Sequence, residues 1–289
     1  MNGYRFVALD VFAEHRFGGN PLAVFPEADG LSTADMQAIA REFNMSEVAF
    51  VERPADRRNT ARVRIFTSAI EIQFAGHPNV GVGWLLASEG RDVDGVLRFE
   101  QGAGLVEVRI ERQGGQVVSS RIGAPQPLRE GVPPTRAEIA ACAGLELDEI
   151  GEAALASVAL NTVCVPVSAE ALARARCRPE AFHDLAARRP DLAEICLLYL
   201  YDRDGAHVRA RMFAPLSGTI EDPATGSAAC ALTALLLKRD GVDGLKLEIT
   251  QGVEMGRPSR MLCEAVRRGD DVAAFVSGAC VPVFRGELI

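Results

Sequence analysis

The segment RVRIFT at residues 62–67 recurs in similar form as RARMFA at residues 209–214. Both stretches are predicted as β-strands. At the same spacing, GHPN at 76–79 falls on PATG at 223–226, and the helix-like stretch 80–87 falls on 227–234. The chain therefore contains an internal repeat, in which a strand leads through a turn-rich loop into a helix.

The repeat extends outward in both directions. Downstream, EQG at 100–102 resembles TQG at 250–252, and upstream, GNPLAV at 19–24 faintly resembles LNTVCV at 160–165. Two such halves, related by a pseudo-two-fold axis, would place equivalent loops across one cleft. Interfaces between domains are favoured places for small-molecule sites.

The length of 289 residues fits about two domains. The best boundary is GAPQPLREGVPP at 123–134, whose four prolines disfavour both helix and central strand. We therefore predict an N-terminal domain at 1–122, a Pro-rich linker at 123–134 and a C-terminal domain at 135–289. The last strand of the chain could cross back and join the first domain.

Many strands with few helices between them indicate an α+β architecture. A helix is predicted from Ser32 to Phe43, with Ser32 as N-cap, and another from about Thr225 to Lys238. Further strands are predicted at 4–12, 48–51, 61–67, 97–110 (two strands), 117–122, 158–167, 195–201 and 207–213.

Composition excludes several classes of function. Hydrophobic residues make up 48% and charged residues 24% of the chain, as in ordinary soluble globular proteins. Lys and Arg number 31 against 39 Asp and Glu, so the net charge of −8 argues against nucleic acid or an anionic membrane as the main partner. A local basic pocket for a small anion stays possible.

The sequence also bears on compartment and cofactor. It has no apolar stretch long enough to span a bilayer and no signal-peptide pattern at its start, so we expect a cytoplasmic protein. The 7 cysteines are scattered without a C-x-x-C pair, which is typical of reduced core cysteines. No H-x-x-H motif occurs, so a metal site is not expected.

Two loops carry the residues best suited to chemistry: FAGHPN at 74–79 and EDPATGS at 221–227. Each would leave the first N–H groups of the following helix unpaired, which creates a site for an anion such as a substrate carboxylate. The competing interpretation is a pair of ordinary turns, with Thr225 or Ser227 capping the second helix. The occurrence of the loop twice, with His in one copy and Asp in the other, favours a site.

Three side chains are candidates for proton transfer. Glu47 lies past the end of a predicted helix and before an apolar strand, where desolvation would raise its pKa toward neutrality. His77 has a pKa near 6.5 in water and could donate a proton or a hydrogen bond. Asp222 adds a carboxylate at a helix start. The alternatives are a solvated Glu47, a structural His77, and an Asp222 that only complements the helix dipole.

Other patterns carry less weight. Arg257, in GRPS at 256–259, could pair with a substrate carboxylate or only stabilise its loop. The motifs of phosphate-binding loops and of serine hydrolases are absent from the sequence. The GVG at 81–83 lies inside a predicted helix and lacks the third glycine of a dinucleotide-binding motif.

Taken together, these residues resemble the PhzF family of phenazine biosynthesis, which is similar in fold to diaminopimelate epimerase. The resemblance spans almost the whole chain. The markers in chain order are DVF at 10–12, GNPLAV at 19–24, NMSE at 44–47, RIFT at 64–67, FAGHP at 74–78, EDPATGSA at 221–228, QG at 251–252 and RPS at 257–259.

The resemblance implies two similar α+β domains, each a strongly curved β-sheet around a central helix, with the active site in the cleft between them. It implies an enzyme that isomerises trans-2,3-dihydro-3-hydroxyanthranilate by moving a proton along the ring system. The expected partner is a small carboxylated substrate, the expected cofactor is none, and the expected assembly is a homodimer.

The resemblance also assigns roles to residues. Glu47 matches the family's acid/base glutamate, and His77 and Asp222 match its assisting polar residues. Gly76 and Ser227 match positions that contact the substrate through backbone or hydroxyl. The expected substrate-binding residues are Ser46, Gly76, Pro78, Thr225, Gly226 and Ser227.

Diaminopimelate epimerase uses a pair of cysteines, one before each helix. The two corresponding positions here hold Gly76 and Pro223. Because neither residue can move a proton, two-thiol racemisation is not expected, and a shuttle through one carboxylate remains. Two alternatives stay open: another cofactor-free epimerase or lyase acting on a different small acid, and a non-catalytic ligand-binding protein of the same fold.

Overall fold

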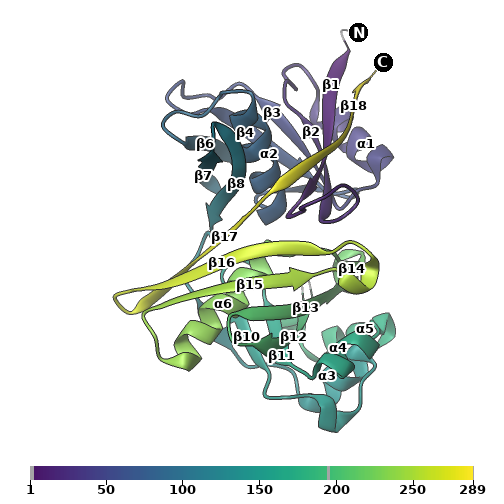
Figure 1. Ribbon diagram of the computed structural model, residues 1–289. Helices are drawn as coiled ribbons and strands as arrows, with labels where there is room; N and C mark the ends of the chain where they lie inside the picture. Colours follow the sequence, from purple (N-terminus) through teal and green to yellow (C-terminus); the bar gives the residue numbers. More distant parts are fainter. Residues whose placement is uncertain (1–2, 194–195, 289) are drawn as a thin grey trace. The chain divides into compact units, whose positions relative to one another are not determined.

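The computed structural model describes residues 3–193 and 196–288, and it divides into two compact units (Figure 1). Unit 1 comprises Met1–Gly123 and Ser277–Ile289, and unit 2 comprises Ala124–Val276. The first boundary lies where the sequence places it. One detail differs, because the segment 124–134 belongs to unit 2, and the C-terminal segment belongs to unit 1, the possibility that the sequence left open.

The elements of unit 1 alternate strands with two helices. Its strands are β1 (Tyr4–Val11), β2 (Asn20–Phe25), β3 (Glu47–Glu52), β4 (Ala61–Phe66), β5 (Glu71–Ile72), β6 (Val96–Gln101), β7 (Gly104–Gln113), β8 (Gln116–Gly123) and β18 (Cys280–Leu288). Its helices are α1 (Thr33–Phe43) and α2 (Gly76–Ser88).

The strands of unit 1 form a curved sheet around α2. β1 pairs antiparallel with both β18 and β2, β2 runs parallel to β3, and β3 pairs antiparallel with β4. β4 runs parallel to β6, which continues antiparallel into β7 and β8. Strands from both ends of this order, β18 and β8 among them, contact α2. The helix is apolar on every side, as expected of a helix enclosed by its sheet.

Two glycines allow the sheet to close tightly on α2. A Cβ on Gly81 would lie 2.5 Å from Leu22 Cδ2, and a Cβ on Gly83 would lie 2.6 Å from Val108 Cγ1. The two positions are about 200° apart around the helix, so they face strands on opposite sides. The GVG motif therefore serves packing.

Replacing Gly83 with alanine is expected to destabilise the protein by about 1–2 kcal/mol net, because the methyl group would overlap Val108 at a cost of about 2–3 kcal/mol. This outweighs the helix propensity of alanine, which favours it over glycine by about 1 kcal/mol. Urea unfolding measures the effect. The matched control is Gly244→Ala, where nothing lies within 4 Å of the new Cβ. Equal stability of the two variants would contradict the packing argument.

Helix α1 is followed after a short turn by β3, which begins with Glu47. It begins as predicted: Ser32 caps it and Asp35 completes a capping box. Its Met36 and Ile39 pack into an apolar cluster that includes residues of β2 and β3. Asn44 ends the helix in the left-handed conformation, with φ of 48°, and turns the chain toward Glu47.

The elements of unit 2 follow the same general order with more helices. Its strands are β9 (Arg129–Gly131), β10 (Ala154–Ser157), β11 (Thr162–Pro166), β12 (Leu197–Asp204), β13 (His207–Ala214), β14 (Thr219–Asp222), β15 (Gly244–Gln251), β16 (Ser259–Arg268) and β17 (Asp271–Gly278), within which the chain returns to unit 1. Its α-helices are α3 (Arg136–Ala143), α4 (Ala169–Arg174), α5 (Pro179–Arg188) and α6 (Gly226–Asp240). Its short 3₁₀ helices are η1 (Leu147–Glu149), η2 (Pro190–Leu192), η3 (Pro215–Ser217) and η4 (Val253–Met255).

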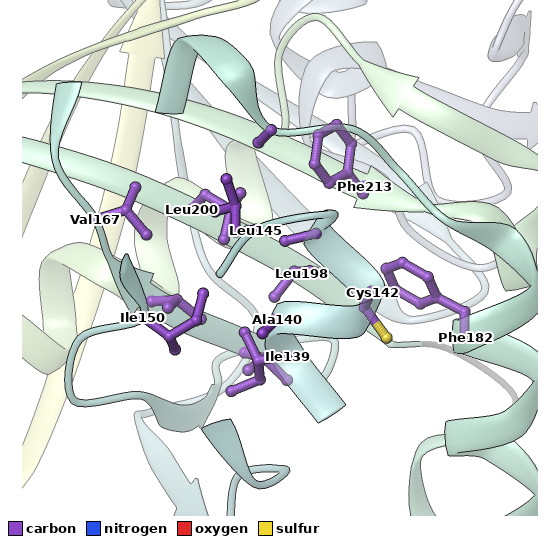
Figure 2. Packing of buried hydrophobic residues seen from close by; sticks show 14 of the residues in the cluster. Ile139, Ala140, Cys142, Leu145, Ile150, Val167, Phe182, Leu198, Leu200 and Phe213 are labelled. Atoms are coloured by element: carbon purple, nitrogen blue, oxygen red, sulfur yellow. The ribbon is translucent and has the colours of Figure 1, made fainter. Parts of the chain in front are cut away.

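Unit 2 also places a buried helix against a curved sheet. β11 and β12 are parallel, β12 and β13 antiparallel, β13 and β15 parallel, and β15 and β16 antiparallel. α6 contacts β10, β11, β15 and β16 and is buried over most of its length. A separate cluster packs Ile139 of α3 and Phe182 of α5 with Leu198 and Leu200 of β12 (Figure 2). Because side chains alternate along a strand, Tyr199 points away from that cluster.

The segment predicted as a linker is part of the unit 2 sheet. β9 pairs antiparallel with β10, and the N–H groups of Ala124 and Leu128 donate to carbonyls of Ala274 and Val272. The composition of the segment predicts that its prolines disfavour a strand. They lie at 125, 127, 133 and 134, outside β9, and the N–H of Gln126 between the first two donates to Val158. Prolines at such positions remove no hydrogen bond from the paired strand.

Two further strand predictions need correction. The strand predicted at 158–167 is β11 alone, because the strand begins only at Thr162 and residues 158–161 form the turn that joins it to β10, which ends at Ser157. The apolar residues of 158–160 conceal the turn in the sequence pattern. The strand predicted at 195–201 is β12, which begins at Leu197. Ile195 lies outside the described residues.

The structure also changes how the two halves of the repeat align after their strands. Arg64 forms a bidentate ion pair with Glu71, and Arg211 forms the same pair with Glu221, at 2.6–2.9 Å. Glu71 follows its arginine by seven residues but Glu221 by ten. The extra residues lie in the turn that contains η3. As a result, α2 begins at Gly76 and α6 at Gly226, so Gly76 corresponds to Gly226 and not to Pro223. Gly226, like Pro223, has no side chain that can move a proton, so the argument against two-thiol racemisation is unchanged.

Candidate active site

Glu47 is the first residue of β3, and its carboxyl group is largely withdrawn from solvent. The side chain is 19% exposed, and its Oε2 is buried and accepts no hydrogen bond from the described residues. Burial raises the pKa of Glu47 to about 7, against the opposing effect of a hydrogen bond with Ser46. Near neutral pH this carboxyl group therefore populates both its forms, as an acid/base catalyst requires.

His77 faces Glu47 from the first turn of α2. Its side chain is 6% exposed, and its Nε2 lies 3.4 Å from Glu47 Oε2. The two residues are distant in sequence, and the curvature of the sheet around α2 brings them together. An imidazole at this distance can hold the carboxylate in place or exchange a proton with it.

Ser46 links Glu47 to the neighbouring strand. Its hydroxyl donates to Asn20 Oδ1 at 3.1 Å, and Asn20 is 1% exposed at the start of β2. β2 and β3 are parallel, with Leu22 opposite Glu47, so their first residues share one edge. The serine has a single hydroxyl hydrogen, which it can give to Asn20 or to Glu47 at one time.

The start of α2 is held without a capping side chain. Ala75 is the N-cap and supplies no side-chain hydrogen bond. Instead, Asn79 donates to the Ala75 carbonyl at 2.9 Å and forms a reciprocal amide pair with Gln101, at 2.6 and 3.2 Å. A helix start of this kind presents its N–H groups to an anion. Gly76 and Pro78 flank His77 in this turn.

Unit 2 carries the second group of predicted residues. Asp222 ends β14, is 8% exposed, and accepts a hydrogen bond from the Thr225 hydroxyl at 2.5 Å. Thr225 stands at the N-cap of α6 but does not cap it with its side chain. The alternative in which Thr225 caps the helix is therefore wrong. Gly226 is buried at the first position of α6, and Ser227 is half-buried after it.

The predicted residues thus form two groups, one in each unit. The group in unit 1 contains Ser46, Glu47, Gly76, His77 and Pro78, and the group in unit 2 contains Asp222, Thr225, Gly226 and Ser227. Arg257 is half-buried, and its backbone N–H donates to Gly252 at 3.0 Å within its loop.

Sequence reasoning missed the residues that support these groups. They are Asn20, Asn79, Gln101, Tyr199 and Gln251, all buried or partly buried and hydrogen-bonded to these groups, to the ends of their loops or to one another. The repeat contained a signal for two of them, because EQG and TQG share the glutamine. Among residues 3–193 and 196–288, no cluster of His, Cys, Asp or Glu has the make-up of a metal site, and no helix is long and apolar enough to cross a membrane.

The chain is similar to known proteins along nearly its whole length. The family model PhzC-PhzF, described as phenazine biosynthesis-like protein, matches residues 9–286. The trans-2,3-dihydro-3-hydroxyanthranilate isomerase of Pseudomonas aeruginosa is 39% identical over 95% of this chain and 95% of its own. An uncharacterised isomerase of Mesorhizobium japonicum is 38% identical over 100% of this chain and 99% of its own.

A solved structure shares the fold. The Bacillus anthracis phenazine biosynthesis protein of the PhzF family superposes with a TM-score of 0.89, at 24% identity and over 100% of both chains. With the matched family model and the curated relatives, this shows that the chain is an isomerase and belongs to the PhzC-PhzF family of phenazine biosynthesis-like proteins.

Proposed function

We propose that this isomerase moves a proton between two carbons of trans-2,3-dihydro-3-hydroxyanthranilate or a closely related unsaturated carboxylic acid, with Glu47 as the acid/base group. One observation carries the assignment of Glu47. Its carboxyl group is buried 3.4 Å from His77, with a pKa of about 7. The name of the Pseudomonas aeruginosa relative supports the substrate.

The reaction needs only proton transfers. The Glu47 carboxylate takes a proton from one carbon of the substrate and becomes a carboxylic acid. The electron pair of the broken C–H bond moves into the conjugated system, and the acid returns its proton to another carbon. The product therefore has the composition of the substrate, and Glu47 ends the cycle ionised.

The surroundings of Glu47 suit both halves of this cycle. The Ser46 hydroxyl can turn to the carboxylate when Glu47 is ionised and back to Asn20 when it is protonated. His77 restrains the carboxyl group from the side of α2. Backbone N–H groups at the start of α2 would stabilise negative charge that develops on the substrate. Asp222 and Ser227 are proposed as further polar groups for the same reaction.

We also propose that the two units are copies of one diaminopimelate-epimerase-like folding unit. Support comes from the two Arg–Glu pairs and from the matching strand registers. Arg62 lies opposite Glu100 across β4 and β6, as Arg209 lies opposite Thr250 across β13 and β15.

The proposed function is tested by incubating the protein with trans-2,3-dihydro-3-hydroxyanthranilate in D₂O and following the mixture by NMR. We expect isomerisation with solvent deuterium at the carbon that receives the proton. Isomerisation without any deuterium would show that Glu47 does not exchange with solvent between the two transfers. Absence of turnover would overturn the substrate, and small unsaturated acids and amino acids would then be screened for solvent deuterium exchange.

The pH dependence of kcat/KM should follow the ionisation of the Glu47 carboxyl group. The carboxylate must be ionised to accept a proton, so activity is expected to fall as the pH drops through about 7. The measurement is kcat/KM from pH 5 to 9 in buffers of constant ionic strength. Activity that stays level from pH 9 down to about pH 5.5, as for a glutamate with the ordinary value of 4.5, would contradict the assignment.

A further inference from the structure

Gln251 is a fully buried side chain at the end of β15, and it holds both ends of the loop that carries Asp222. Its Oε1 accepts from the Tyr199 hydroxyl at 3.0 Å and from the Thr225 N–H at 3.4 Å. Its Nε2 donates to the Asp222 carbonyl at 2.7 Å and to the Thr225 hydroxyl at 3.0 Å. All four contacts lie within unit 2.

The direction of each hydrogen bond in this network follows from chemistry. A backbone N–H only donates and a carbonyl only accepts, so Thr225 N and Asp222 O fix the orientation of the Gln251 amide. Thr225 accepts from Nε2, and its one hydroxyl hydrogen is therefore directed to Asp222 Oδ2. Burial raises the pKa of Tyr199 well above its usual value, so its hydroxyl stays protonated and donates to Gln251.

The backbone beside Gln251 fits the loop closely. Gly252 has φ of 78°, and a Cβ there would lie 2.7 Å from the carbonyl oxygen of Pro223 and 2.5 Å from that of Arg257. The strand end and the loop therefore approach too closely for a side chain at 252. This contact and the Gln251 amide restrain the loop from two directions.

We propose that Gln251 is a positioning residue that acts through Thr225 to orient the Asp222 carboxylate, and that Tyr199 fixes the Gln251 amide. The inference rests on the role proposed above for Asp222. Unit 1 supports this use of a glutamine at a strand end, because Gln101 at the end of β6 holds Asn79 at the start of α2. In unit 2 the glutamine instead holds the loop that carries the polar group.

The main test is a pair of kinetic comparisons with Gln251→Met, which keeps the length of the side chain and removes its donors and acceptor. In the native background we expect kcat to fall about 10–100-fold with KM changed less than about threefold, because misorientation of a reacting group acts on turnover. In an Asp222→Asn background the same change should lower kcat less than about threefold. Equal losses in both backgrounds would overturn the proposal.

A milder variant keeps the test decisive if Gln251→Met fails to fold. Tyr199→Phe removes only the hydroxyl that fixes the amide, and we expect a loss in kcat of about 3–10-fold that disappears in the Asp222→Asn background. The matched control is Thr233→Val, which removes a buried hydroxyl further along α6. It should leave kcat within about twofold, and a loss as large as that of Tyr199→Phe would argue for a general packing effect.

Hydrogen exchange supplies a readout independent of turnover. The Thr225 amide donates to Gln251, so its exchange should be at least about tenfold faster in Gln251→Met and in Tyr199→Phe than in the native protein. Unchanged exchange would overturn the proposal. If the native protein fails to turn over the substrate, or if Glu47→Gln leaves turnover unaffected, the proposed function fails, and the exchange rates still decide whether Gln251 holds the loop.

Discussion

Replacing Glu47 with glutamine is expected to lower kcat by about 10²–10⁴-fold, the usual contribution of a positioned acid/base group. Glutamine has nearly the same size and shape, so it preserves the packing at the start of β3. It cannot take a proton from carbon or return one. Because the loss lies in the chemical step, KM should change much less than kcat.

The matched control is Glu52→Gln, at the other end of β3. Glu52 is also a mostly buried carboxylate, and its charged neighbour is Arg62, at 3.7 Å. This change should leave kcat within about twofold. Both variants are assayed by initial rates and by deuterium incorporation. A Glu47→Gln protein that still incorporates deuterium at the native rate would remove Glu47 from the reaction.

The same substitution is expected to change the pH dependence of stability. The pKa of Glu47 is about 7 in the folded protein and near 4.5 in an unfolded chain, so the folded protein binds more protons between these values. Native stability therefore falls as the pH rises through this window, by about 3 kcal/mol in total, since each pKa unit corresponds to 1.36 kcal/mol. Glutamine does not ionise and escapes this loss.

We therefore expect Glu47→Gln to gain about 3 kcal/mol relative to the native protein between pH 4.5 and pH 8. Urea unfolding at several pH values gives the difference, and the 19% exposure of the side chain makes this an upper value. Glu52→Gln again serves as control. Parallel stability curves for Glu47→Gln and the native protein would show that Glu47 titrates at its ordinary pKa. With the raised pKa of Glu47, we expect the variant to be less active and more stable above neutral pH, as where function requires a buried charge.

The parts of the fold and site that the sequence predicts well are local. Ser32 is predicted as the N-cap of its helix, and its side chain accepts the capping hydrogen bond from Asp35 N–H. The loops that carry His77 and Asp222 can be identified as candidate sites from the sequence, because each combines turn residues with a following apolar helix. These signals act over a few residues, and neighbours in sequence are enough to specify them.

The errors come from interactions over longer separations. The alignment of the repeat rests on its strands, but the turn before Glu221 is longer than the one before Glu71, and the ion pairs and the helix starts together reveal the shift. Gln251 lies 29 residues from Asp222 and 52 from Tyr199, so its role depends on strand pairing that no local pattern records. The number of prolines at 124–134 predicts a linker. Their spacing, however, keeps the N–H groups of Ala124, Gln126 and Leu128 free to donate to the rest of unit 2.

The pairing of β18 with β1 has a consequence for biosynthesis. Tyr4 lies opposite Leu288, so the sheet of unit 1 is complete only after the last strand has left the ribosome. Unit 2 is formed by one continuous stretch, 124–276, and all of it emerges earlier. The later half of the chain is therefore able to fold first, which reverses the usual order during translation. Until then β1 has an exposed edge, and a nascent chain stalled before residue 280 would keep that edge open to aggregation or to a chaperone.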